Sequence, residues 1–198
     1  PIYGYFASKW LRKQHNGLEI NNVFDITLPK TNLFISIIVL IIKLLNKFNI
    51  IKSQYSNDLN PTLNSIFFIG FWQNQIYFKD SAKTIKFRNV KLNTSNKNCL
   101  ENILNSNSVS IHIRRGDYLN KQNFPIYGNI CTIEYYQKAI QRIKELIENP
   151  VFFIFSDDKN WVKENLTLEN AEYITYNKGT SSYLDMYLMS HCKANIIA

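Results

Sequence analysis

The second half of the chain shows hydrophobic patterns that switch between strand-like and helix-like periods. Residues 109–114 alternate strictly between apolar and polar positions, and residues 151–155 form one continuous apolar run, so both segments predict strands. Between them, Thr132 is a suitable N-cap for a helix over residues 133–148. The buried stripe of that helix is expected to contain Tyr136, Ile140, Ile143 and Ile147.

The same alternation continues to the end of the chain. A short helix that includes Trp161 is expected to begin at Asp157 or Asp158. It is followed by a strand over residues 172–176, a helix over 181–192 and the start of a strand at 196–197. Strands that alternate with helices require crossover connections, which predicts an α/β fold with a mostly parallel sheet. Ligands of such sheets bind at the carboxyl ends of the strands.

The first half gives a weaker pattern. It predicts a helix over residues 2–15, a strand over 22–26, a helix over 33–47 and a strand over 66–71, and no clear element between residues 80 and 100.

The apolar stretch around the predicted 33–47 helix is too short to span a membrane. Its uninterrupted apolar part is about ten residues long, whereas a spanning helix needs about 20. Lys43 and Lys47 fall on one stripe with Ser36, so the helix is amphipathic. Packing against a core is the first interpretation, and contact with a membrane surface is the alternative.

Composition narrows the function classes. The chain has 198 residues, of which 45% are hydrophobic and 19% charged, and this balance excludes a disordered chain. The net charge of +8 comes mostly from dispersed Lys, which favours a solvated surface over a nucleic-acid interface. Three Cys with no CxxC spacing argue against a disulfide scaffold and fit a reducing compartment.

Two adjacent Arg residues end the first strand of the second half. His112 and Arg114 lie on the same side of the strand, about 7 Å apart, and Gly116 permits a turn that can redirect Arg115. Two guanidinium groups at a strand end suit the oxygens of a diphosphate. The alternatives are a turn salt bridge between Arg115 and Asp117 and, less favoured, an adhesive Arg-Gly-Asp motif.

Ser156, Asp157 and Asp158 follow the apolar strand directly. Carboxylates at this edge can accept hydrogen bonds from a nucleotide base or a ribose. They can also cap the next helix, and a metal–diphosphate site is a third possibility.

The third candidate segment is Gly179 to Ser182, a turn rich in hydroxyl groups before a helix. Thr180 and Ser181 could bind an anion there or act as an ordinary N-cap. Asp185 lies on that helix beside apolar positions and is expected to pair with Arg114 or Arg115.

Several of these motifs resemble, in the same order, those of the bacterial α-1,2-fucosyltransferases of glycosyltransferase family 11. HxRRGDY over residues 112–118 is the most specific of them, and residues 1–7 resemble the helix that follows the family's glycine-rich turn. The other matching segments are residues 70–73 with 77–78, residues 153–158 with Trp161, residues 177–179 and residues 185–192.

The resemblance implies a GT-B-like fold with two Rossmann-like halves and mostly parallel sheets. Residues 1–106 would form an acceptor-side α/β region, and residues 107–198 a GDP-sugar-binding domain. The family's glycine-rich turn would precede Pro1 and a further segment would follow Ile197, so we expect a fragment truncated at both ends with an incomplete second half.

The resemblance also implies a reaction, in which L-fucose moves from GDP-β-L-fucose to the 2-hydroxyl of a galactoside with inversion, in cell-surface glycan or O-antigen synthesis. Arg114 and Arg115 would hold the diphosphate, with His112 and Asp158 near the guanine and no metal or other cofactor. Asp117 is the first candidate for the general base, and Glu134 and Asp25 remain open. Asp158 would select GDP over ADP because adenine lacks the donors that guanine offers.

Two alternatives remain open: a transferase of similar architecture that uses another nucleotide sugar, and an inactive nucleotide-binding remnant. The expected partners are GDP-fucose and a galactose-terminated glycan, without nucleic acid. The expected location is the cytoplasm, with peripheral contact at the inner face of the membrane left open. The sequence does not indicate the oligomeric state.

Overall fold

The structure is a computed structural model that describes residues 20–26, 33–51, 53–55, 67–69, 85–116, 118–128 and 130–198. Contacts divide the chain into two compact units, Pro1–Asn89 and Val90–Ala198, which are described separately below. This division lies earlier than the boundary expected at residue 107. The difference arises because helix α4 (Thr94–Leu104) packs on elements of the second unit.

The second unit is built on a four-stranded sheet in which every pair of neighbouring strands is parallel. The strand order is β5-β4-β3-β6. The strands are β3 (Asn107–Ile113), β4 (Pro150–Ser156), β5 (Ala171–Ile174) and β6 (Ala194–Ile196). The predicted parallel α/β architecture is therefore confirmed for this unit, and it is consistent with a Rossmann-like fold.

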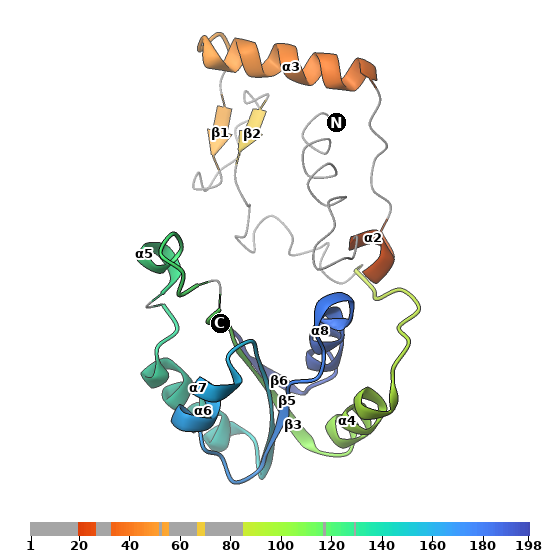
Figure 1. Ribbon diagram of the computed structural model, residues 1–198, viewed down its shortest axis with the longest axis vertical. Helices are drawn as coiled ribbons and strands as arrows, with labels where there is room; N and C mark the ends of the chain where they lie inside the picture. The colour runs from red at the N-terminus through yellow and green to blue at the C-terminus, as the bar shows by residue number, and fades with distance from the viewer. Residues whose placement is uncertain are drawn as a thin grey trace. The chain divides into compact units, whose positions relative to one another are not determined.

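Helices cover both faces of this sheet (Figure 1). Helices α6 (Ile133–Leu146) and α7 (Lys159–Asn165) lie on one face, and α4 and α8 (Tyr183–Met189) lie on the other. Alternate residues of β4 enter the two cores: Phe152 and Ile154 on the α6 side, Phe153 and Phe155 on the α4 side. A strand covered on both faces needs apolar side chains at every position, which explains the continuous run from 151 to 155.

Three helical features differ from the sequence predictions. The helix expected over 181–192 is split into a 3₁₀ turn, η3 (Gly179–Ser181), and α8. Helix α5 (Phe124–Tyr127) was not predicted, and neither was α4. The sequence of α4 is mostly polar, and of its residues only Asn96, Cys99 and Ile103 are buried.

The first unit contains two helices and two short strands in its described part. Helix α3 (Leu33–Lys47) has the predicted limits, and β1 (Ser53–Tyr55) pairs in parallel with β2 (Phe67–Ile69). The strand predicted over residues 22–26 is wrong, because helix α2 (Ile20–Val23) extends into it and only Phe24 makes a bridge of the strand type. The predicted helix over residues 2–15 lies outside the described residues.

One antiparallel bridge, between Phe24 and Phe87, follows α2 in the first unit. The two phenyl rings pack with their centroids 4.9 Å apart. Among the helices that the structure describes, none combines the length and the apolar character that crossing a bilayer requires.

Candidate active site

The register between β3 and β4 brings two of the predicted motifs together. Ile113 lies beside Ser156 in this parallel pair, so the residues that follow each strand leave the same edge of the sheet side by side. Residues 114–116, which follow β3, therefore lie beside residues 157–158, which follow β4. The expectation that the polar residues gather at the carboxyl ends of the strands is correct for this pair of strands.

Asp157 holds the turn that follows β3. Its Oδ1 accepts a hydrogen bond from the backbone N–H of Arg115 at 2.9 Å, and its Oδ2 accepts one from that of Gly116 at 3.0 Å. A Cβ atom at position 116 would lie only 2.9 Å from Oδ2, so glycine allows this close approach. Asp157 thus fixes the backbone from which the two Arg side chains extend.

Asp158 joins the same turn to helix α7. Its Oδ1 accepts a hydrogen bond from the backbone N–H of Trp161 at 3.1 Å, which makes Asp158 the N-cap of α7, as one of the predicted alternatives required. Its Oδ2 lies 3.2 Å from Nε of Arg115. The backbone N–H of Asp158 donates to Oγ of Ser156 at 3.0 Å, so Ser156 supports the cap.

Arg115 is held from two directions. Besides its ion pair with Asp158, its guanidinium carbon lies 4.1 Å above the centroid of the Trp161 ring, a cation–π arrangement. The Arg115 side chain is 25% exposed. A guanidinium carries five N–H donors, and the ion pair uses the one on Nε, so the group is fixed in place while its terminal nitrogens keep donor capacity. The predicted alternative, a salt bridge with Asp117, concerns a residue outside the described part of the chain.

Arg114 has a different environment. Its side chain is exposed, and its guanidinium carbon lies 5.2 Å from the centroid of the Tyr118 ring. Arg114 also affects its neighbour: burial and the positive charge of Arg114 lower the pKa of His112, although Asp157 opposes this shift. His112 is therefore neutral at pH 7, and one ring nitrogen can donate while the other accepts.

The carbonyl group of His112 accepts a hydrogen bond from the Tyr136 hydroxyl at 3.4 Å. This contact ties the end of β3 to helix α6, where Tyr136 is 1% exposed. The end of the strand that carries His112 and the two Arg residues is thus anchored on its covered side as well as by Asp157.

The hydroxyl-rich segment forms local contacts. Oγ of Ser181 accepts from the backbone N–H of Lys178 at 3.0 Å and donates to the Lys178 carbonyl at 2.9 Å, so Ser181 closes the η3 turn in the manner of a cap. Thr180 is exposed. The anion-binding role of both hydroxyl groups stays a prediction.

The expected ion pair of Asp185 with Arg114 or Arg115 is wrong. Oδ1 of Asp185 instead accepts a hydrogen bond from Nδ2 of Asn177 at 2.7 Å. Burial raises the pKa of Asp185 from 3.8 to about 6, which is the reverse of the effect of a neighbouring guanidinium. The partner of Asp185 is therefore an uncharged amide and not a cation.

A buried amide pair continues this network. Asn177 and Asn96 exchange two hydrogen bonds of 2.9 Å through their side chains, and Asn96 also donates to Oδ1 of Asn93, which caps α4. Asn96 is fully buried, so its amide needs these partners. Asn96 was not predicted from the sequence, although Asn93 three positions earlier is an N-cap residue that could have indicated α4.

The other candidates for the general base have partners of their own. Glu134 is fully exposed in the first turn of α6, and a hydrogen bond from Thr132 lowers its pKa. Asp25 belongs to the first unit and pairs with Arg88 at 3.1 Å. Over the described residues, no group of three or more His, Cys, Asp or Glu side chains is arranged to hold a metal ion.

The fold and this site define an α/β protein with charged and polar side chains at the carboxyl edge of a parallel, Rossmann-like sheet. The chain belongs to Glycosyl transferase family 11, whose sequence profile matches residues 18–198. It is therefore related to glycosyltransferases, which confirms the family resemblance noted in the sequence.

Individual relatives agree with this assignment. The chain is 36% identical over 192 residues to an alpha-1,2-colitosyltransferase of Escherichia coli, an alignment that covers 91% of this chain and 66% of that protein. It is 40% identical over 96 residues to the O-antigen biosynthesis glycosyltransferase WbnK of Escherichia coli, covering 48% of this chain and 32% of the relative. It is 29% identical over 94 residues to the galactoside 2-alpha-L-fucosyltransferase Sec1 of Mus musculus, covering 46% of this chain and 26% of the relative.

The chain thus spans at most about two thirds of the length of these relatives. No solved structure matches this chain.

Proposed function

We propose that this protein is an inverting glycosyltransferase that moves L-fucose from GDP-β-L-fucose to the 2-hydroxyl of a galactoside. The observation that carries the proposal is the pair Arg114 and Arg115 at the end of β3, with Arg115 already held by Asp158 and Trp161. Membership of a family with α-1,2-fucosyltransferase and α-1,2-colitosyltransferase relatives supports the reaction class.

In this proposal the two guanidinium groups bind the diphosphate of the donor. Negative charge grows on the leaving GDP as the glycosidic bond breaks, and fixed cationic donors stabilise that charge without having to reorganise. Loss of one such hydrogen-bond donor typically raises the activation barrier of the transfer by about 3 kcal/mol. Arg115 contributes a group whose orientation is set beforehand, and Arg114 contributes the more exposed one.

The proposed step is a single displacement, because the donor is β-linked and the product α-linked. The acceptor oxygen forms a bond to the anomeric carbon, the bond from that carbon to the diphosphate oxygen breaks, and the electron pair leaves on GDP. A base takes the proton of the acceptor hydroxyl. We propose Asp117 for this role because it directly follows the Arg–Arg–Gly turn.

The remaining site residues would bind the nucleoside. We propose that neutral His112 and Asp158 lie near the guanine, and that Ser156 and Asp157 line the same edge, with Thr180 and Ser181 towards an anionic group. Each Asp158 oxygen already accepts one hydrogen bond but has a second lone pair. Asp158 would therefore act on the donor both directly and through Arg115. No metal cofactor is part of the proposal.

A second donor sugar, colitose, is supported by one of the relatives. The relative that aligns over most of the chain is a colitosyltransferase, and colitose is L-fucose without its 3-hydroxyl. A site that hydrogen-bonds the 3-hydroxyl would reject colitose strongly, whereas a site that does not would accept both sugars. The acceptor would be a galactose-terminated glycan in O-antigen or other cell-surface glycan synthesis. Three free Cys fit a cytoplasmic location.

Two measurements test the proposal. The melting temperature of the chain is recorded with GDP, UDP, CMP and ADP, and we expect GDP to stabilise it most. Transfer to lactose is then compared between GDP-fucose and GDP-colitose. Stabilisation by UDP but not by GDP would refute a GDP-sugar donor, and GDP binding without transfer of either sugar would favour a nucleotide-binding protein over a transferase.

A further inference from the structure

Helix α3 carries apolar side chains on two opposite faces, and only one of them is covered. Val39 and Ile42 are 5% and 8% exposed, so this face is covered. The other face is open over the whole length of the helix. Its large apolar side chains, each about half exposed or more, are Leu33, Phe34, Ile37, Leu40, Ile41 and Leu44.

These exposed residues form one continuous strip. At 100° per residue they occupy an arc of about 120° around the helix axis, with the buried residues on the far side. Phe48 and Ile50, which follow the helix, are also exposed and extend the strip at its C-terminal end. Soluble monomers rarely expose so large an apolar surface without a partner, so the strip marks an interaction site.

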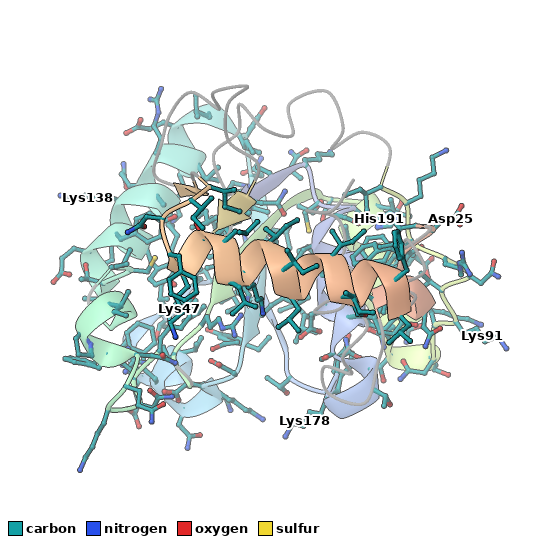
Figure 2. All side chains as sticks on the ribbon, turned by 90° about the horizontal axis from the view of Figure 1, so that it is seen from above. Asp25, Lys47, Lys91, Lys138, Lys178 and His191 are labelled. Atoms are coloured by element: carbon teal, nitrogen blue, oxygen red, sulfur yellow. The ribbon has the colours of Figure 1, made fainter. Side chains whose placement is uncertain are left out.

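Basic residues border this strip, and acidic ones are absent from the surrounding sequence. Lys43 and Lys47 lie beside the apolar arc on one edge and are both exposed. Figure 2 looks onto α3 and shows Lys47 near its C-terminal end. No Asp or Glu occurs between Asp25 and Asp58, whereas this stretch contains four Lys residues. Its charge therefore complements an anionic surface.

We propose that the open face of α3 docks onto the surface of a membrane that contains anionic phospholipids. The helix has 15 residues and is about 22 Å long, too short for a hydrocarbon core about 30 Å thick, so it would lie in the plane of the interface. Its apolar strip would enter the boundary between headgroups and acyl chains, and its Lys side chains would contact the headgroups. This inference does not depend on the proposed transferase activity.

The chemistry favours lipid over a protein partner. The strip is uniformly aliphatic and aromatic, without the polar groups that fix the orientation of a specific protein interface. Attraction of each Lys to an anionic leaflet adds to the favourable burial of the apolar side chains. Both contributions come from the same helix and from adjacent positions on it.

Flotation with vesicles tests the proposal on the 198-residue chain. One set of vesicles contains phosphatidylcholine alone, and a second set also contains about 40% phosphatidylglycerol. We expect the chain to float with the second set and not with the first, and to be released by high salt. Equal binding to both sets, or binding to neither, would overturn the proposal.

Two pairs of variants locate the contact. Leu40→Ser with Leu44→Ser removes two side chains that are 58% and 49% exposed, and we expect binding to fall at least tenfold. The matched control is Ile126→Ser with Leu146→Ser, whose side chains are each 62% exposed in the second unit, and binding should persist. Unchanged melting temperatures would show that both variants fold.

Lys43→Gln with Lys47→Gln should weaken binding to the anionic vesicles by about tenfold or more while the variant folds normally. Sedimentation velocity without lipid tests the alternative that a second copy of the chain binds the open face of α3. A dimer that the Leu40→Ser and Leu44→Ser pair dissociates, together with no vesicle binding, would replace the lipid proposal. Retained vesicle binding by that pair would place any lipid contact away from α3.

Discussion

Nε of Arg115 lies 3.2 Å from Oδ2 of Asp158, and this ion pair connects the turn after β3 with the first turn of α7. The pair is partly exposed, at 25% and 33% for the two side chains, so its direct contribution to stability is small. Its consequence is orientation: the guanidinium has one position before any nucleotide arrives. The side-chain ordering that phosphate binding would otherwise require is already complete.

Replacement of Asp158 should separate orientation from helix capping. Asp158→Asn keeps an oxygen that can accept from the backbone N–H of Trp161 but loses the charge that holds Arg115. We expect GDP affinity to fall by at least about threefold to tenfold, because Arg115 must then be ordered on binding and the guanine loses a charged acceptor, with little change in stability. Asp158→Ala should weaken GDP binding similarly and also lower the free energy of unfolding by about 1 kcal/mol, because the cap is lost.

Calorimetric titration with GDP and denaturant unfolding of both variants measure these effects. If the Asn variant bound GDP more tightly than the unmodified chain, Asp158 would act on the phosphates by charge repulsion, and the orientation argument would be wrong.

Gly116→Ala should disturb the same site through the backbone. The new Cβ would meet Oδ2 of Asp157 at 2.9 Å, so the carboxylate must move and its hydrogen bonds to the turn weaken. We expect a loss of about 1 kcal/mol in stability and a clear loss of GDP affinity, because the turn carries both Arg residues.

Asn149→Ala is a matched control at the opposite edge of the sheet. Asn149 has a φ of 48° just before β4, so alanine there also costs about 1 kcal/mol. This variant should bind GDP normally. Similar GDP affinities for the two variants would show that the geometry of the 114–116 turn does not control donor binding.

Asp185 should make stability depend on pH. Its pKa is raised to about 6, so the folded state holds the proton more tightly than the unfolded state. The stabilising contribution is complete below pH 3.8 and is lost as the pH rises through about 6. Asp185→Asn keeps an acceptor for Asn177 and carries no charge, so it should be more stable than the unmodified chain near neutral pH, by on the order of 1–2 kcal/mol.

Thermal unfolding of both proteins at about pH 5 and about pH 7.5 tests this prediction. The comparison must use the difference between the two proteins, because the lowered pKa of His112 contributes a pH dependence of opposite sign. A difference that does not grow with pH would contradict the burial of an ionised Asp185.

Most helices and strands of the second unit could be predicted from the sequence. A strand covered on both faces, such as β4, must be apolar throughout, which makes it easy to recognise. The sequence also placed the candidate residues at one edge of the sheet, because parallel topology brings carboxyl ends together. Helix α4 was not predicted because it has no long apolar stripe. Its buried residues are Cys99, Ile103 and the polar Asn96.

Side-chain pairing was harder to predict than position. The sequence suggested Asp185 as a partner for Arg114 or Arg115, but the register of β3 on β4 brings Asp158 to Arg115 from 43 positions away. A register of this kind depends on the whole sheet and is not a local property. The partner of Asp185, Asn177, lies only eight positions earlier in the chain, but it is an uncharged amide and so does not stand out as a partner for a carboxylate.

The most direct test of the central claim is the affinity of Arg114→Ala for GDP, measured by isothermal titration beside Arg142→Ala. Arg142 pairs with Glu145 on the surface of α6 and serves as a control for the loss of one positive charge. We predict that Arg114→Ala binds GDP at least tenfold more weakly, as expected for the loss of a charged donor, while Arg142→Ala binds normally. Equal affinity of Arg114→Ala and the unmodified chain would contradict the assignment of this guanidinium to the diphosphate.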